Sequence, residues 1–391
     1  MMQRFRQMRN LPFFYDRWLL SVSLALVCFG VLMVSSASMV ISDKIYHEPF
    51  HYLLKQAFYL ASGLFLAWIF SRIPLKVWES MGFTLLLLCF VLLLAVLVPG
   101  IGSEVNGARR WVKLGFFSLQ ASELVKLMVI LYMAGFLQRH LREVQTRLSG
   151  FIKPMIVLSL IGALLMLEPD FGATSVIAMT VLLLLFLAGA RLLPFIVMFL
   201  CVAGGLFLLA VASPYRLERL TTFLNPWLHA YDSGYQLTQS LIAFGRGGLF
   251  GVGLGNSVQK LFYLPEAHTD FIFAVIAEEL GFAGELLLVT LFAILVARII
   301  HIGRCALQQE QWFAGYTAWG IGLWMGLQTL INIGVNVGLL PTKGLTLPLI
   351  SYGGSSVWVT CAALGILLRI SYEVQTQGVT PMVSGMRRRV S

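Results

Sequence analysis

The stretch FGATSVIAMTVLLLLFLAG, residues 171–189, is followed two positions later by LLPFIVMFLCVAGGLFLLAV, residues 192–211. Each block is apolar, free of charge and close to the ~20 residues with which an α-helix crosses the ~30 Å hydrocarbon core of a bilayer. Strands of a membrane β-barrel would instead alternate polar and apolar residues over about ten positions. The two blocks therefore predict two membrane helices joined by a short turn.

Blocks of the same kind recur along the whole chain, of which 58% is apolar and 12% charged, against about a quarter charged in soluble domains. We expect an all-α, polytopic membrane protein that forms one domain over residues 1–391 and has about ten transmembrane helices. The expected helices cover 18–40, 52–71, 78–98, 121–137, 151–168, 171–189, 192–211, 271–297, 313–339 and 346–368.

The basic residues predict the orientation. With a cytoplasmic N-terminus, seventeen of the 28 Lys and Arg residues fall in cytoplasmic segments and nine in external ones, as the positive-inside rule requires. The cytoplasmic tails are then 1–17 and 369–391, and a large external loop, 212–270, lies between the seventh and eighth helices. Because the net charge of +10 is spread over short loops and both ends, it does not indicate nucleic-acid binding.

The five cysteines show no C-x-x-C spacing and no histidine partner, so neither a disulfide framework nor a zinc site is expected. The large loop contains a predicted short amphipathic helix over 234–244, with Tyr235, Thr238 and Ile242 on one face. The glycine-rich stretch GRGGLFGVGLGNS, residues 245–257, lacks the G-K-[ST] ending of a nucleotide-binding loop. Its glycines favour a tightly folded loop.

Charged residues at the external end of the fourth predicted helix form the first candidate site. Glu123 and Lys126 share one helix face at spacing i,i+3, and a charge inside a membrane helix usually faces a partner or a wet cavity. Arg109, Arg110 and Lys113 lie just upstream in the other long external segment, 99–120. Together they could bind a substrate phosphate, although a structural ion pair and lipid-headgroup contact remain the alternatives.

The second candidate site is the end of the large loop, where His268 and Asp270 precede the eighth predicted helix. Asp270 could be a helix cap or a general base, and the residues alone leave both open. Two turns deeper, we expect Glu278 or Glu279 to be a buried structural partner, with Lys55 as the candidate cation. Glu168-Pro169-Asp170 is expected to form the turn between the fifth and sixth helices.

Long motifs in the chain resemble the SEDS (shape, elongation, division and sporulation) family over nearly its whole length. The motifs are NGARRWVKLG at 106–115, SELVK at 122–126, EPDFGAT at 168–174, GYQLTQSLIAFGRGG at 234–248, GLGNSVQKLFYLPEAHTDFIFAVIAEELG at 253–281 and GLLPTKGLTLPLISYGGSS at 338–356. The last motif looks more like the division members of Gram-negative bacteria than the elongation members.

The resemblance implies a peptidoglycan glycosyltransferase of the inner membrane that polymerises lipid II at the division septum. It also implies an essential aspartate at Asp270 and a Glu and Lys pair at Glu123 and Lys126. The implied partners are a class B penicillin-binding transpeptidase and the division proteins FtsQ, FtsL, FtsB and FtsN. We expect the transpeptidase to dock on the eighth and ninth helices.

The expected reaction is inverting and releases undecaprenyl pyrophosphate, with Asp270 as the base. His268, Arg109, Arg110 and Lys113 would bind substrate, and Lys126 would offset the charge of the leaving group. A divalent cation, Mg or Mn, could share that task, although the sequence shows no metal ligand set. The alternatives are a lipid II flippase and a non-catalytic scaffold of the division machinery.

Overall fold

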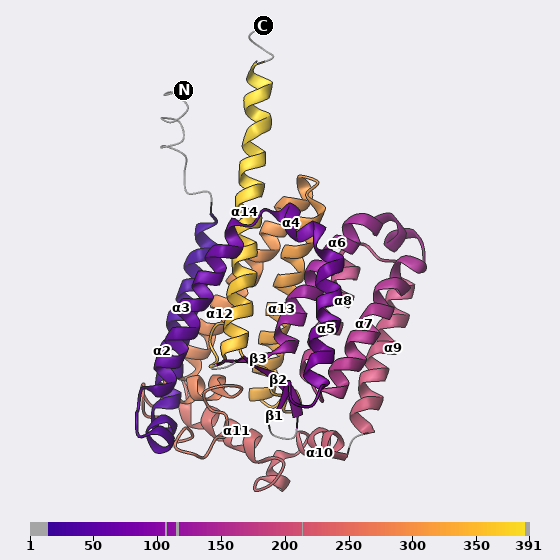
Figure 1. Ribbon diagram of the computed structural model, residues 1–391. Coiled ribbons are helices and arrows are strands. Elements are labelled where there is room, and N and C mark those ends of the chain that lie inside the picture. The colour runs from indigo at the N-terminus through magenta and orange to yellow at the C-terminus, as the bar shows by residue number, and fades with distance from the viewer. Residues whose placement is uncertain (1–14, 106–107, 115–116, 213, 388–391) are drawn as a thin grey trace.

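The computed structural model describes residues 15–105, 108–114, 117–212 and 214–387 (Figure 1). The predicted N-terminal tail, 1–17, and the last four residues fall largely or wholly outside these ranges. Helices dominate the described chain, as predicted, and the longest apolar ones stand side by side as a bundle. Helix α2 begins, and α14 ends, at the same end of the bundle, while the β-strands, α10 and α11 lie at the opposite end.

Ten apolar helices in the described part of the chain match the ten predicted blocks. They are α2 (Arg17–Tyr46), α3 (His51–Arg72), α5 (Gly82–Leu97), α6 (Ala121–Thr146), α7 (Ser149–Leu167), α8 (Phe171–Leu187), α9 (Leu192–Val211), α12 (Ile272–Gln308), α13 (Trp312–Asn336) and α14 (Gly354–Arg387). Eight of them are long and apolar enough to cross a membrane. Because α5 and α8 have only 16 and 17 residues, the count of ten spans stays a prediction. The short helix α4 (Leu75–Ser80) precedes α5.

The end of the bundle where both termini lie is fastened by Asp16. Its side chain caps α2 by accepting a hydrogen bond from the Leu19 amide at 2.9 Å, the usual role of aspartate before a helix. The same carboxylate pairs with Arg298 of α12, and the Asp16 amide donates to Ser371 of α14. Three helices distant in sequence therefore meet at one buried side chain.

Helices α3 and α14 pack closely because small residues face each other along their contact. A Cβ added to Gly365 would overlap the Ala67 backbone, and one added to Gly63 would lie 3.0 Å from the Cys361 sulfur. Small residues of this kind allow helix backbones to approach closely in membrane bundles.

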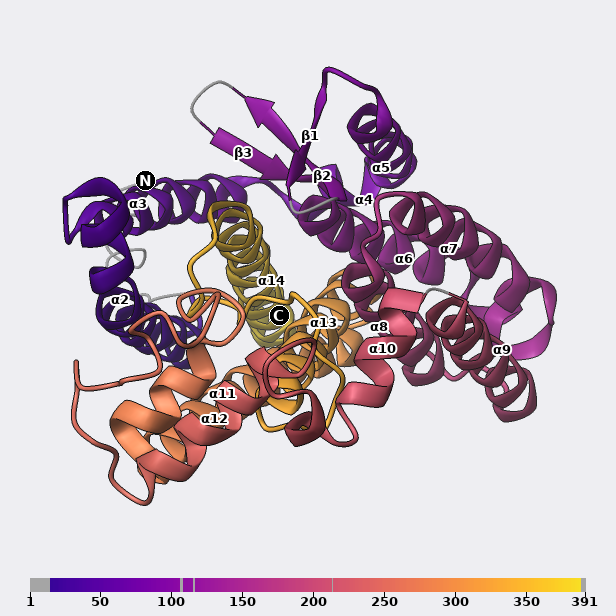
Figure 2. The ribbon, with the colours of Figure 1, turned by 90° about the horizontal axis from the view of Figure 1, so that it is seen from below.

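The segment between α5 and α6 is a small antiparallel sheet that the sequence analysis did not anticipate. Its strands are β1 (Gly102–Val105), β2 (Ala108–Leu114) and β3 (Phe117–Gln120), in the order β1-β2-β3. Figure 2 shows the sheet beside the ends of α5 and α6 that it joins. It is the one exception to the all-helical expectation within the described residues, and it leads directly into the start of α6.

The large loop folds into helix α10 (Pro214–Thr222), the 3-10 turn η1 (Pro226–His229) and helix α11 (Tyr235–Gly247). Helix α11 confirms the helix predicted over 234–244. Thr238 lies on the buried side of this helix, whereas Ile242 is exposed. Leu237, Ser240 and Ala243 complete the buried side, which packs on α12.

The glycine-rich segment after α11 is inserted into a break in α12. At Gly281 the helix leaves its regular path with φ 65° and ψ −165°, and a Cβ there would overlap the backbone of residues 249–251. The loop supplies the hydrogen bonds that the break removes: Val252 N donates to Glu278 O at 3.0 Å, and Phe282 N donates to Gly248 O at 2.9 Å. Glycine is needed here for both the positive φ and the close approach.

The last predicted helix, 346–368, begins later than expected, at Gly354. The preceding residues form an irregular but largely buried segment, in which Leu347 and Ile350 are 0% exposed. Pro348 and Gly353 disfavour a helix here. Side chains satisfy its backbone instead, since Gln328 donates to Thr346 O and Ser351 accepts from Leu347 N. Such backbone is tolerated at membrane depth only where protein surrounds it.

Candidate functional site

A buried ion pair within α6 is hydrogen-bonded to α13. Lys126 Nζ donates to Glu123 Oε1 at 2.8 Å and to Gln328 Oε1 at 2.7 Å, and the Lys126 side chain is 1% exposed. Its ammonium also lies 5.4 Å from the ring centroid of Trp324. The predicted pairing of Glu123 with Lys126 is therefore present, within a network that closes over the lysine.

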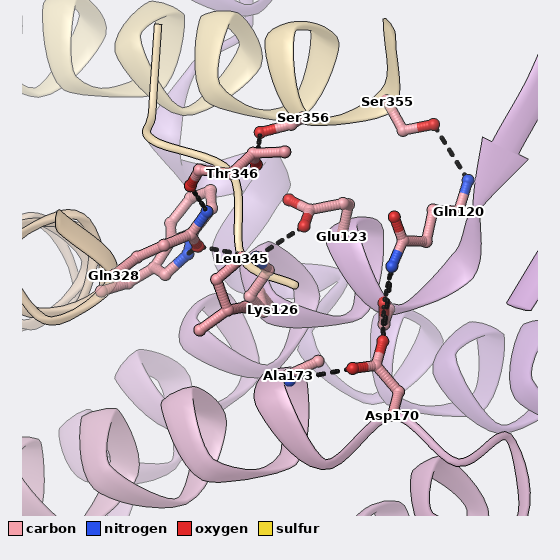
Figure 3. A network of polar contacts seen from close by, with 12 residues as sticks. Gln120, Glu123, Lys126, Asp170, Ala173, Gln328, Leu345, Thr346, Ser355 and Ser356 are labelled. Atoms are coloured by element: carbon pink, nitrogen blue, oxygen red, sulfur yellow. Dashed lines mark hydrogen bonds and ion pairs between the residues drawn. The ribbon is translucent and has the colours of Figure 1, made fainter. Parts of the chain in front are cut away.

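The network continues toward the irregular segment before α14 (Figure 3). Gln328 donates through Nε2 to Thr346 O at 2.8 Å, so one amide contacts both the ion pair and this segment. Glu123 Oε2 is buried and has no hydrogen-bond partner among the described residues. A buried carboxylate oxygen without a partner is costly, and it gives this network one unused acceptor.

Asp270 lies in the last turn of the large loop, and it is not the cap of α12. The residue at the N-cap position is Phe271, with no side-chain cap. The hydroxyl of the preceding residue, Thr269, donates to Glu266. The Ala274 amide in the first turn donates to Phe271 O at 3.1 Å and to Asn336 Oδ1 of α13 at 3.2 Å. The Asp270 carboxylate is therefore free of the structural role that capping would give it.

The environment of Asp270 favours its neutral form more than water does. Burial, reinforced by the negative charge of Glu266, raises the pKa of Asp270 to about 7, although Arg110 and Arg219 act in the opposite direction. A carboxyl group that is half ionised near neutral pH is suited to accept a proton during catalysis. The two arginines also place positive charge near this carboxylate.

Strand β2 separates the three predicted cations. Arg110 donates to two carbonyls of the turn between α7 and α8, Glu168 O at 3.2 Å and Pro169 O at 2.6 Å. Arg109 turns to Glu104 at 3.2 Å and is exposed. Lys113 is also exposed. Because side chains alternate along a strand, Arg110 points away from Arg109 and Lys113, and it alone lies in the electrostatic environment of Asp270.

The turn that Arg110 contacts is formed by Glu168, Pro169 and Asp170, as predicted from the sequence. It contains two buried acids. Asp170 caps α8 through the Ala173 amide at 3.1 Å and accepts from Ser122 of α6 at 2.8 Å. Glu168 is 0% exposed, and both of its carboxylate oxygens lack partners among the described residues. Burial and the neighbouring Asp170 raise the pKa of Glu168 to about 8, against the effect of Arg110.

His268 lies in an aromatic cluster at the start of α3. Its ring centroid is 4.9 Å from that of Tyr52 and 5.5 Å from that of Tyr352. Its Nδ1 is buried and has no partner among the described residues, and burial lowers the pKa of His268. The imidazole therefore lies two residues from Asp270 with one buried ring nitrogen that no described residue uses.

Glu278 and Glu279 are both buried partners, but the expectation of Lys55 was wrong. Glu279 pairs with Lys260 at 2.6 Å and accepts from Ser36 of α2 at 2.7 Å. Glu278 accepts from the Val258 amide at 3.0 Å. Lys55 is exposed. The glycine-rich loop returns to α12 and brings Lys260 to Glu279, a contact that spacing along the sequence did not reveal.

Three amide side chains of α13 near this site escaped the sequence analysis. Gln328, Asn332 and Asn336 are buried at 1%, 2% and 0% exposure. They recur every four residues in an otherwise apolar block, and this spacing places them on one helix face. That pattern could have identified them, because polar groups inside a membrane helix usually face protein or a cavity.

No group of three or more His, Cys, Asp or Glu side chains in the described ranges is placed to hold a metal ion. The divalent cation allowed for by the sequence analysis stays a prediction, and no catalytic step below depends on it.

The fold and these sites define a multi-pass helical membrane protein with a cluster of charged groups at the end opposite its termini. The chain belongs to the FtsW/RodA/SpoVE family of cell cycle proteins, whose family model matches residues 17–376. The SEDS resemblance is thereby confirmed.

Relatives in other bacteria are similar over nearly their whole length. A probable peptidoglycan glycosyltransferase FtsW of Coxiella burnetii is 62% identical over 92% of this chain and 97% of its own. A protein of the same name in Legionella pneumophila is 54% identical over 95% and 94% of the two chains.

Solved structures agree with this assignment. A chain from work described as "Structural coordination of polymerization and crosslinking by a peptidoglycan synthase complex" superposes with a TM-score of 0.76 and 29% identity, over 92% of this chain and 98% of that one. Rod shape determining protein RodA of Thermus thermophilus gives a TM-score of 0.67 and 29% identity, over 91% and 96% of the two chains.

Proposed function

We propose that this chain is a peptidoglycan glycosyltransferase that polymerises lipid II, with Asp270 as its general base. One observation carries the assignment of the base: the carboxylate stands at the start of α12, is not used as a helix cap, and has a pKa raised to about 7. The names and the lengthwise similarity of the relatives support the activity.

In the proposed reaction, Asp270 accepts the proton of a sugar hydroxyl on one lipid II molecule. The hydroxyl oxygen forms a bond to the anomeric carbon at the end of another chain, and the bond from that carbon to undecaprenyl pyrophosphate breaks. A single base fits inversion and a β-1,4 linkage. The N–H groups of Arg110 that the turn leaves unused would bind pyrophosphate oxygens.

The buried Lys126 has a different place in this proposal. Its ammonium is fully engaged by Glu123, Gln328 and the Trp324 ring, so it would act on the leaving group through the field of the network. Glu123 positions it. Direct contact of Lys126 with substrate would require the network to open.

The experiment that tests the proposal follows glycan formation by purified protein with labelled lipid II. A polymerase makes glycan strands without other enzymes, whereas a flippase or a scaffold does not. Asp270→Asn should fold and insert but lose about 10²–10⁴ in rate, as expected for a missing general base. Asp270→Glu should keep part of the activity. An Asp270→Asn variant with more than about a tenth of the wild-type rate would remove Asp270 from the role of base.

The proposal extends to location and partners. A class B penicillin-binding transpeptidase fits the neighbour from a peptidoglycan synthase complex, and we propose that it docks on the outward face of α12, where Leu286 and Leu287 are exposed. FtsQ, FtsL, FtsB and FtsN would join it at the septum. Both termini would be cytoplasmic, so a topology reporter near Ala230 should read as external and one after the last residue as cytoplasmic. The opposite pair of readings would show that the chain has the opposite orientation in the membrane.

A further inference from the structure

Two neighbouring asparagines of α13 bind the backbone of Asp270. Asn332 and Asn336 are one helical turn apart, and each donates through Nδ2 to the Asp270 carbonyl oxygen, at 2.9 and 3.0 Å. Both side chains are buried, at 2% and 0% exposure. A carbonyl oxygen has two lone pairs, and here both are used by one pair of amides.

The same amides bind the segments on either side of Asp270. Asn336 accepts from the Ala274 amide at 3.2 Å and so completes the first turn of α12. Asn332 donates also to Leu345 O, at 2.6 Å, in the irregular segment that precedes α14. The end of the large loop, the start of α12 and this segment are thereby held at one point on α13.

The carboxylate of Asp270 has no such support of its own. Among the described residues it takes part in no hydrogen bond or ion pair, and it lies beside Gly344, where an added Cβ would be 3.0 Å from Asp270 Oδ2. Its position is therefore set by the backbone that carries it. A catalytic group usually depends on hydrogen bonds from a supporting shell to keep its geometry, and in this site those bonds reach the carbonyl group of the residue.

We propose that Asn332 and Asn336 are positioning residues that hold the Asp270 carboxylate where it meets the attacking hydroxyl. The inference rests on the proposed role of Asp270 as base. Neither amide touches substrate in this account, since both are buried behind the loop that carries Asp270.

A purely structural role predicts a different outcome from a positioning role. Hydrogen bonds between neutral groups each contribute little to stability, so losing one amide should leave the helix bundle folded. A displacement of about 1 Å at a reacting group, in contrast, can lower a rate by about 10²-fold. The reaction rate of variants that remain folded therefore distinguishes the two roles.

The test compares Asn332→Leu and Asn336→Leu with Thr329→Val, using purified protein in the lipid II polymerisation assay. Thr329 lies on the same face of α13 and is buried, and its hydroxyl has no partner within the described ranges, so it is a matched control. We expect kcat to fall by about 10²-fold in each asparagine variant, with KM and Tm near those of the control. If a leucine variant does not insert, Asn332→Ser and Asn336→Ser remove the amides with a smaller change.

Double variants with Asp270→Asn separate the inference from the proposed function. If the amides act through the carboxylate, Asn332→Leu should lower the residual rate of Asp270→Asn by less than about twofold, because coupled residues are not additive. An undiminished 10²-fold effect in that background would overturn the positioning role, as would wild-type kcat in the single variants. High activity of the single variant Asp270→Asn would instead show that Asp270 is not the base.

Discussion

Gly344 and Asp270 approach each other so closely that a Cβ added to Gly344 would lie 3.0 Å from Asp270 Oδ2. The backbone of Gly344 is not in the positive-φ region where glycine is favoured, so the residue type matters here for space. The missing side chain leaves room beside the carboxylate on the exposed side of the irregular segment.

Alanine at Gly344 should therefore impair catalysis more than folding. The added methyl group must push the Asp270 carboxylate aside by a few tenths of an ångström, and we expect at least a tenfold loss of polymerisation rate with Tm nearly unchanged. Gly353→Ala is the matched control, because its Cβ would meet its nearest neighbours at an ordinary 3.7 Å. Equal rates in the two variants would mean that catalysis does not need the space beside Asp270.

The pH dependence of the rate should follow the ionisation of Asp270. Only the ionised form can accept a proton, so the rate should be half-maximal near pH 7 and level off above it. Glu266 helps to raise this pKa, and Glu266→Gln should therefore shift the rising part of the profile to lower pH. Glu310→Gln, in the turn between α12 and α13, is the control. A pH profile that Glu266→Gln leaves unshifted would mean that the ionisation of Asp270 beside Glu266 does not set the pH dependence of the rate.

Glu168 should make stability depend on pH. Its pKa rises from an ordinary 4.5 to about 8 in the folded protein, so the folded state binds a proton that the unfolded state has lost between these values. Stability is then fully present below about pH 4.5 and declines until about pH 8. Glu168→Gln removes this dependence. The Tm of the wild type relative to the variant should fall between pH 5 and 8, and parallel curves would contradict a buried neutral Glu168.

The pair of Lys260 and Glu279 should show strong coupling. Removing one partner leaves an uncompensated buried charge, which costs about 3–5 kcal/mol, so Lys260→Met and Glu279→Leu should each lower Tm sharply. The double variant should recover much of the loss, because it leaves neither charge. Thermal unfolding in detergent measures all three. Additive losses would show that the two side chains are energetically independent.

The helices were predictable from sequence because their signal is local. A block such as 192–211 is apolar over the length of a span, and no distant residue changes that. The small sheet was missed because strands of four to seven residues carry little periodicity of their own. The helix over 346–353 was predicted wrongly because its residues are apolar, as in a span, while amide side chains from α13 satisfy its backbone.

The candidate site shows the same division between local and distant information. Glu123 and Lys126 were paired correctly because they are three residues apart on one helix. The partner of Glu279 was not, since Lys260 reaches it only after the glycine-rich loop has folded back on α12. Asn332 and Asn336 act on Asp270 across more than sixty positions of sequence, and no spacing rule connects such residues.

The break at Gly281 also constrains the order in which the protein can assemble. Until residues 248–253 return to α12, the broken turn lacks hydrogen bonds for several backbone groups, each costing several kcal/mol in a membrane. The bent form of α12 and the folded loop must therefore appear together, as one late step after the helices have inserted. We expect an alanine at Gly251, where a Cβ would overlap the Glu279 backbone, to block this step. The inserted protein would then remain open to protease along residues 248–270.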